Sequence, residues 1–154
     1  MTRNALIAVV ATAAIALAGC GDDKKDSNKQ LSYSGFVSEA NKVCKDQDAK
    51  IDPISNKLTG QADNDAPIYE ELIPKLEDAR DDFAELKPPD ELKPDFDKVV
   101  SLIDAQIQGA KTAQSAAQTG DQEAYDAAIA ELRPLSAQTE EAQSKLGAAD
   151  CLED

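Results

Sequence analysis

Three cysteines are the most reactive side chains in this sequence of 154 residues, and they stand at Cys20, Cys44 and Cys151. A cysteine thiol can act as a nucleophile, bind a metal ion, carry a covalent modification or form a disulfide. Because the sequence contains no histidine, catalysis by Ser–His or Cys–His pairs and histidine-ligated metal sites are excluded. The cysteines are far apart and form no C-x-x-C motif, which disfavours a redox-active pair.

Carboxylates are the second group of candidates, because 30 Asp and Glu against 16 Lys and Arg give a formal net charge of -14. Such a charge disfavours binding to nucleic acid and to anionic lipid headgroups. The stretches 46–57 and 63–71 begin with D-x-D, as an EF-hand calcium loop does, but both lack the glycine at the sixth loop position. Acid pairs on solvated helix faces also lack the apolar surroundings that raise a catalytic pKa. We therefore expect no metal, no cofactor, no nucleic acid partner and no enzymatic activity.

The amino-terminal residues have the features of an export signal. Arg3 supplies a positive charge, and the 14 residues 5–18 are apolar except for Thr12. A helix of this length spans about 21 Å, which is shorter than the roughly 30 Å hydrocarbon core of a bilayer. The stretch is therefore typical of a signal peptide and not of a stable membrane span.

The end of this apolar stretch, Leu17-Ala18-Gly19-Cys20, resembles the lipobox of bacterial lipoproteins. The resemblance implies a diacylglyceryl group on the sulfur of Cys20 and cleavage before that residue, so that residues 1–19 are a signal peptide. A diacylglyceryl group holds a protein durably to a bilayer. The alternatives are a secretory signal with an incidental cysteine and an uncleaved apolar anchor. We expect a lipid-anchored protein on the extracytoplasmic face of the cell membrane or in the periplasm, and inner and outer membrane both stay open.

Residues 20–33 are predicted to form a disordered tether after the lipid. They carry almost no apolar residue before Leu31, and such a composition cannot bury enough surface to offset chain ordering. The folded domain is expected to occupy residues 34–154. The tether would let this domain stand off the membrane.

Apolar residues in the folded region recur every three or four positions, which predicts helices. Gly60, Pro88-Pro89 and Gly120 divide the region into four segments. Asp65 and Asp121 are expected to cap the second and the fourth. The fold class is therefore all-α, an up-down-up-down four-helix bundle. The predicted core positions are Phe36, Ala40, Val43, Ile51, Ile54 and Leu58; Ile68, Leu72, Leu76, Ala79, Phe83 and Leu86; Leu92, Phe96, Val99, Ile103, Ile107 and Ala110; and Ala128, Leu132, Leu135, Ala142 and Leu146.

A shift of the sequence by 60 residues reveals a weak internal repeat. Phe36 falls on Phe96, and Pro74 falls on Pro134. This offset predicts a duplicated helical hairpin, and the alternative is two similar hairpins of equal helix length. Each proline removes a backbone hydrogen bond and is expected to kink its helix. The kinks would either widen the core into a ligand cavity or follow the curvature of the bundle.

Cys44 and Cys151 are left as a pair once Cys20 is assigned to lipid. An exported protein meets an oxidising compartment, where two such cysteines form a disulfide. The first and fourth helices of an up-down bundle bring the two chain ends together, so the pairing fits the predicted fold. Two free buried thiols are the alternative.

The chain as a whole resembles small helical lipoproteins of the actinobacterial type. The resemblance lies in an early EANKVCKD, a central KPPDELKPDFDKV and a late KLGAADC, and it implies an architecture without an activity. The predicted function is a non-enzymatic interaction or accessory module that docks to other envelope proteins. The alternative is a bundle that binds a small ligand or lipid in a cavity near Pro74 and Pro134.

Overall fold

The computed structural model describes residues 30–151 of the chain. The predicted signal peptide 1–19, the predicted lipidation site Cys20 and most of the predicted tether lie outside the described residues. Residues 30–33, assigned above to the end of the tether, contact the folded domain. The Leu31 backbone N–H donates to the Lys87 carbonyl over 3.0 Å, and the Gln30 amide donates to Asp90 over 2.9 Å. The described chain is therefore attached to the bundle from its first residue onward.

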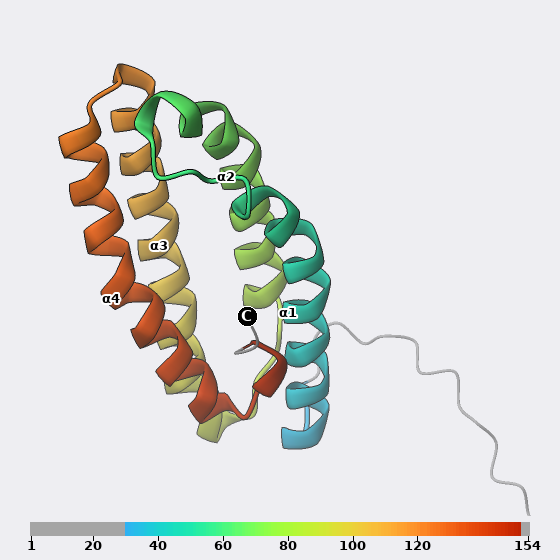
Figure 1. Cartoon of the computed structure of the whole chain (residues 1–154). Helices are drawn as coiled ribbons and strands as arrows, with labels where there is room; N and C mark the ends of the chain where they lie inside the picture. Colours follow the sequence, from blue (N-terminus) through green and yellow to red (C-terminus); the bar gives the residue numbers. More distant parts are fainter. Residues whose placement is uncertain (1–29, 152–154) are drawn as a thin grey trace, which may run out of the picture.

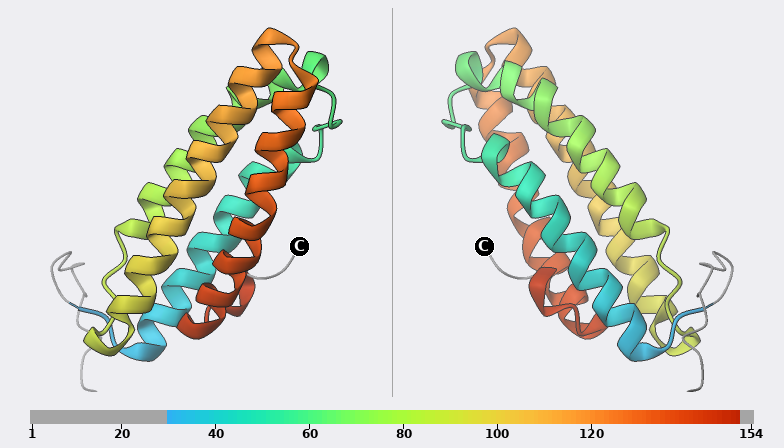
Figure 2. Two further views of the ribbon diagram at one scale, coloured as in Figure 1. Left: turned by 90° about the vertical axis from the view of Figure 1, so that its left-hand side faces the viewer. Right: turned by 90° about the vertical axis from the view of Figure 1, so that its right-hand side faces the viewer.

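The described residues form four α-helices and two short 3-10 turns (Figure 1). The helices run alternately up and down, side by side along their lengths (Figure 2), and no strand occurs among residues 30–151. The prediction of an all-α, up-down-up-down four-helix bundle is thus confirmed. The elements are α1 (Tyr33–Ser55), α2 (Ala62–Ala84), η1 (Asp90–Leu92), α3 (Lys93–Thr119), α4 (Gln122–Leu146) and η2 (Ala149–Cys151).

The predicted capping residues are found at the start of α4 and the end of α3, but not at the end of α1, where Asn56 is the cap, or at the start of α2. The Asp121 carboxylate accepts a hydrogen bond from the Ala124 backbone N–H over 3.0 Å and caps α4, as predicted. Gly120 ends α3 in the left-handed conformation with φ of 68°, which suits a residue without a Cβ. The prediction that Asp65 caps α2 is wrong: the helix begins at Ala62, and Asp65 lies inside its first turn.

The helices keep the 60-residue register of the sequence repeat. The first residue of α3 lies 60 positions after that of α1, and the first residue of α4 lies 60 positions after that of α2. Phe36 and Phe96, which occupy equivalent positions, meet edge to face in the core with ring centroids 5.9 Å apart. The equal 60-residue spacing of the helix starts agrees with a repeated hairpin. That one hairpin arose by duplication of the other stays a prediction.

Helix packing is uneven around the bundle. α3 packs closely on α4 and on α2, and α1 packs on α2 and on η2. Gly109 permits the close approach of α3 to α4, because a Cβ at that position would lie 2.5 Å from Leu132 Cδ2. Among the described elements, α1 and α4 lack packing of this kind, and Figure 1 shows their ribbons apart. The side between α1 and α4 is the most loosely packed, although Phe36 of α1 and Leu146 of α4 share one core cluster. We call it the open side of the bundle.

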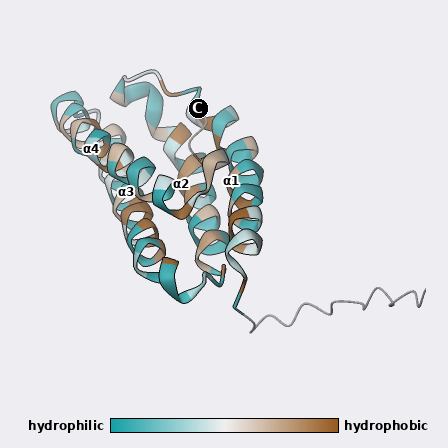
Figure 3. Cartoon of the chain, turned by 90° about the horizontal axis from the view of Figure 1, so that it is seen from below, coloured by the Kyte–Doolittle hydropathy of each residue, from teal (hydrophilic) through white to brown (hydrophobic). Residues whose placement is uncertain are grey.

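The hydrophobic core consists of two clusters, one toward each end of the bundle. Hydrophobic and hydrophilic positions alternate along each helix (Figure 3), and the buried residues are mostly apolar. One cluster contains Ile54, Tyr69, Leu72, Ile73 and several small alanines of α3. The other contains Phe36, Phe83, Phe96, Val99 and Leu146, with the two cysteines packed against it.

Pro74 and Pro134 lie within α2 and α4, and both are exposed. An exposed proline points its ring away from the core, so neither widens the core directly. This placement favours the interpretation in which the prolines follow the curvature of the bundle. The predicted kink at each proline stays a prediction.

None of the described helices is both long enough and apolar enough to cross a membrane.

Candidate functional site

A groove of about 240 Å³ opens between α1 and α4 on the open side of the bundle. Residues of α2 and α3 form its floor. They include Leu76, Ala79, Arg80, Phe83 and Ile103. The α1 wall presents Val43, Gln47, Asp48 and Ile51, and the α4 wall presents Ser136, Thr139, Glu140 and Gln143. The arrangement combines an apolar floor with walls rich in amide, hydroxyl and carboxylate groups.

Five of the predicted core residues line this groove and are only partly buried. They are Val43, Ile51, Leu76, Ala79 and Ile103. Their helical spacing turns them toward the bundle axis, as predicted, but α4 does not pack against α1 to cover them. The groove therefore separates the two core clusters and leaves apolar surface in reach of solvent.

The disulfide between Cys44 and Cys151 closes one end of the groove. Its two Cα atoms lie 5.0 Å apart, and both cysteines line the cavity. The predicted pairing is thus confirmed. Because Cys151 belongs to η2, which follows α4 in the chain, the bond ties the end of α4 to the middle of α1.

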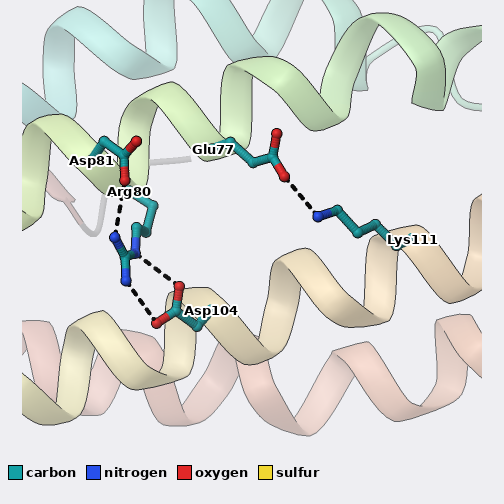
Figure 4. Close-up of polar contacts among 5 residues, drawn as sticks. All are labelled: Glu77, Arg80, Asp81, Asp104 and Lys111. Carbon is teal, nitrogen blue, oxygen red and sulfur yellow. Dashed lines mark hydrogen bonds and ion pairs between the residues drawn. The ribbon is translucent and has the colours of Figure 1, made fainter.

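Two ion pairs hold the opposite, closed seam between α2 and α3 (Figure 4). In the first, Arg80 Nε and Nη2 donate to the two carboxylate oxygens of Asp104 over 2.8 and 3.2 Å. In the second, Lys111 Nζ lies 2.7 Å from Glu77 Oε1. Arg80 also donates to Asp81 over 2.9 Å, and its hydrogen bonds to Asp104 and Asp81 raise the pKa of its guanidinium.

The open seam between α1 and α4 has no counterpart to either ion pair. A shift of 60 residues carries the first pair onto Glu140 and Cys44, and the second onto Ala137 and Ile51. Neither combination can form an ion pair. The α2–α3 side is therefore bridged by these ion pairs, whereas on the α1–α4 side the disulfide links α1 to η2, which follows α4.

A second constellation lies at the far end of the bundle, around the buried carboxylate of Asp65. Its oxygens accept hydrogen bonds from the Thr59 and Gly60 backbone N–H groups over 2.8 Å each, and from Tyr125 Oη over 2.7 Å. Tyr125 Oη also lies 3.4 Å from Tyr69 Oη. This cluster joins the α1–α2 loop, α2 and α4.

Burial alone would raise the pKa of Asp65, but the hydrogen bonds from Thr59, Tyr125 and Gly60 outweigh it and lower that pKa. Burial, together with the hydrogen bonds to Tyr69 and Asp65, raises the pKa of the Tyr125 hydroxyl. Asp65 is thus ionised and Tyr125 neutral at physiological pH. Neither residue lines the groove, and their hydrogen bonds tie the α1–α2 loop to α2 and α4.

The acidic stretches considered for calcium are helical over most of their lengths. Residues 46–55 belong to α1, and residues 63–71 belong to α2, so neither forms a calcium loop. Within the described part of the chain, no three Cys, Asp or Glu side chains are grouped so that they could hold a metal ion.

No family model, no curated protein and no solved structure matches this chain. The site is therefore interpreted from its own residues.

Sequence reasoning identified the cysteine pair but not the groove or the Asp65 cluster. The acidic residues Glu77, Asp81 and Asp82 are exposed on α2. Their contacts were not predicted: Glu77 and Asp81 form ion pairs, and Asp82 accepts a hydrogen bond from Gln47 of α1. The 60-residue repeat was the one sequence signal that the α1–α4 side differs from the α2–α3 side. It places Arg80 and Asp104 at positions where the other hairpin has Glu140 and Cys44.

Proposed function

We propose that this protein is a lipid-anchored, extracytoplasmic module that binds a partner protein of the cell envelope and catalyses no reaction. The observation that carries this proposal is the groove between α1 and α4, where an apolar floor meets polar walls in reach of solvent. The lipobox that ends at Cys20 supports the anchor.

The chemistry of the described side chains supports binding over catalysis. Asp65, whose pKa is lowered, and Tyr125, whose pKa is raised, bond to each other away from the groove. Arg80, the cation in the groove floor, is engaged by Asp104 and Asp81. A catalytic site instead needs reactive groups that converge on a shared cavity.

A bundle that binds a small ligand or lipid is the second candidate. It is favoured by the position of the groove, whose lining includes Leu76 and Ser136, two residues beyond Pro74 and Pro134. However, about 240 Å³ is less than the roughly 300 to 1,000 Å³ of typical small-molecule sites. An open groove of this size suits the side chains of a macromolecular partner better than an enclosed ligand.

The point at which the chain joins the bundle, at Gln30, supports one orientation of the domain toward the membrane. Gln30 bonds to η1, at the end of the bundle where α1 begins. Residues 20–29 span at most about 35 Å when extended, so this end would face the bilayer and the Asp65 cluster would face away.

Substitution Cys20→Ser is expected to move the protein from the membrane fraction to the soluble fraction, because the lipid would have no attachment atom. Membrane fractionation of cells that express each variant measures this. The neighbouring substitution Ser27→Ala should leave the protein with the membranes. Unchanged sedimentation of Cys20→Ser with membranes would contradict the anchor.

A photo-crosslinking residue in place of Gln143, on the α4 wall, is expected to give one discrete adduct in intact cells. The same residue in place of Asp126, an exposed position of α4 that does not line the groove, is the control. Gel separation followed by mass spectrometry measures the adducts. Adducts of the same pattern from both positions would contradict the groove as the contact site.

A further inference from the structure

We propose that the disulfide between Cys44 and Cys151 is a redox-sensitive switch, whose reduction by a dithiol releases η2 from α1 and loosens the groove. The release is independent of any partner, whereas its effect on binding rests on the proposed function. The proposal is carried by the position of the bond, by the polar character of the α4 wall, and by the contacts that hold α1 in the bundle without the bond.

The disulfide lies where a thiolate from solvent can reach it. Both cysteines are partly buried and line the groove, which opens to solvent. Thiol–disulfide exchange begins with direct attack of a thiolate on one of the two sulfurs, so its rate depends on access to them. A disulfide enclosed in the core would need the protein to unfold first. The bond between Cys44 and Cys151 is therefore reducible in the folded protein.

This bond stands in place of an ion pair. Under the 60-residue shift, Cys44 corresponds to Asp104, which accepts hydrogen bonds from Arg80 on the α2–α3 side. A reductant leaves an ion pair unchanged, whereas a disulfide opens when it gains two electrons. The α1–α4 side thus carries a link that responds to redox conditions, at the position where the α2–α3 side carries one that does not.

The α4 wall gives this side little further attachment. Its residues and their equivalents on α2 are Ser136 and Leu76, Thr139 and Ala79, Glu140 and Arg80, and Gln143 and Phe83. Leu76 and Phe83 pack in the two core clusters, whereas Ser136 and Glu140 are exposed. Because polar groups gain little from leaving water, α4 has little tendency to close on α1 once the bond opens.

η2 can leave α1 as a unit. It lies beside α1 at the end of the chain (Figure 1). The backbone N–H groups of Gly147, Ala149 and Cys151 donate to the carbonyls of Ser144, Gly147 and Ala148. These hydrogen bonds are local to the segment, so they stay intact when η2 moves away from α1.

The remaining contacts of α1 keep the reduced protein folded. α1 packs on α2, and Gln47 donates a hydrogen bond to Asp82. Phe36 meets Phe96 in the core. Reduction therefore frees one side of α1 while the other side stays attached. The distance between the groove walls is then no longer fixed, and a groove that is less preorganised binds its partner more weakly.

The step is a two-electron exchange with a dithiol, which a thiol–disulfide oxidoreductase of the envelope would supply. One thiolate of the reductant attacks a sulfur of the disulfide, which gives a mixed disulfide and releases the other cysteine as a thiolate. The second thiol of the reductant then attacks the mixed disulfide and releases the remaining cysteine. The reductant leaves with an internal disulfide, and its two protons end on Cys44 and Cys151.

Dithiothreitol, a small dithiol, tests whether the bond is reducible in the folded protein. The protein is the whole chain with Cys20→Ser, and a polyethylene glycol maleimide marks each free thiol by a shift on a gel. We expect the same rate of reduction in Asp65→Ala as in the parent, because Asp65 lies away from the groove. Asp65→Ala is expected to raise the unfolded population about 100-fold or more.

A matching acceleration in Asp65→Ala would show that reduction needs global unfolding, and would overturn the switch. Urea just below the unfolding transition provides a second measurement that does not depend on the variant. The rate should stay nearly constant there, and a rate that rises in parallel with the unfolded population would also overturn the switch.

Amide NMR shifts and circular dichroism then measure what reduction releases. We expect the reduced protein to keep its helicity, to shift the amides of Ile51 and Gln143 on the two groove walls, and to leave that of Tyr69 unchanged. The double variant with Cys44→Ser and Cys151→Ser should show the same pattern without reductant. Loss of helicity, or shifts confined to the neighbours of the cysteines, would overturn the switch.

The photo-crosslinking residue in place of Gln143 measures the effect on binding. In cells that carry it in the double variant, we expect loss of the discrete adduct that the disulfide-bonded protein gives. An equal yield of adduct would show that the redox state does not control binding. If the disulfide-bonded protein itself gives no adduct while its reduction shifts the groove amides, the proposed function fails and the switch stands.

Discussion

Substitution of both Cys44 and Cys151 by serine is expected to lower the free energy of unfolding by about 4 to 5 kcal/mol. The disulfide joins residues 107 positions apart, and in the chain-entropy model a bond that closes so long a loop strongly restricts the unfolded state. The effect is large relative to the roughly 5 to 15 kcal/mol that stabilise a typical domain.

Urea denaturation followed by circular dichroism measures this difference. The parent protein in reducing buffer should unfold at the same urea concentration as the double variant, and Cys20→Ser alone should unfold like the oxidised parent. Because α1 is tied to η2 through this bond, its amides should lose hydrogen-exchange protection more than those of α3 and α4. Equal urea midpoints for the oxidised parent and the double variant would contradict the prediction.

Substitution Asp65→Ala is expected to cost about 3 to 5 kcal/mol of stability. It leaves the buried Tyr125 hydroxyl and the partly buried Thr59 and Gly60 backbone N–H groups without their acceptor. Asp63→Ala is the matched control, because Asp63 lies in the same first turn of α2 but is exposed. It loses a similar interaction with the helix dipole, worth about 0.3 to 1 kcal/mol, and no buried hydrogen bond.

The pH dependence gives an independent test of the same carboxylate. Because the folded protein holds the pKa of Asp65 below its ordinary value of 3.8, the unfolded chain binds the proton more readily. The stabilisation is therefore complete above that value and is lost as the pH falls through the lowered folded pKa. The stability difference between the parent and Asp65→Asn should shrink below about pH 4. A difference that stays constant down to pH 2 would show that the Asp65 charge contributes nothing.

Much of the fold could be predicted from the sequence because it depends on local signals. Apolar spacing marked the four helices, Gly120 marked the end of α3, and the side chain of Asp121 caps α4 as expected. The prediction for Asp65 was wrong because an acidic residue early in a helix resembles a cap in sequence. Its side chain instead turns back to the loop before the helix, where Thr59 and Gly60 supply donors.

The sequence alone determined the four-helix architecture through its helical periodicity. It also predicted the pairing of Cys44 with Cys151, which follows once Cys20 is assigned to lipid. Only the tertiary structure decided that α1 and α4 stay apart and that Val43, Ile51 and Leu76 line a groove. The physical reason is that periodicity fixes the direction in which a side chain points, but not the distance to the helix it faces. That distance depends on contacts between helices, such as Arg80 with Asp104, which one seam has and the other lacks.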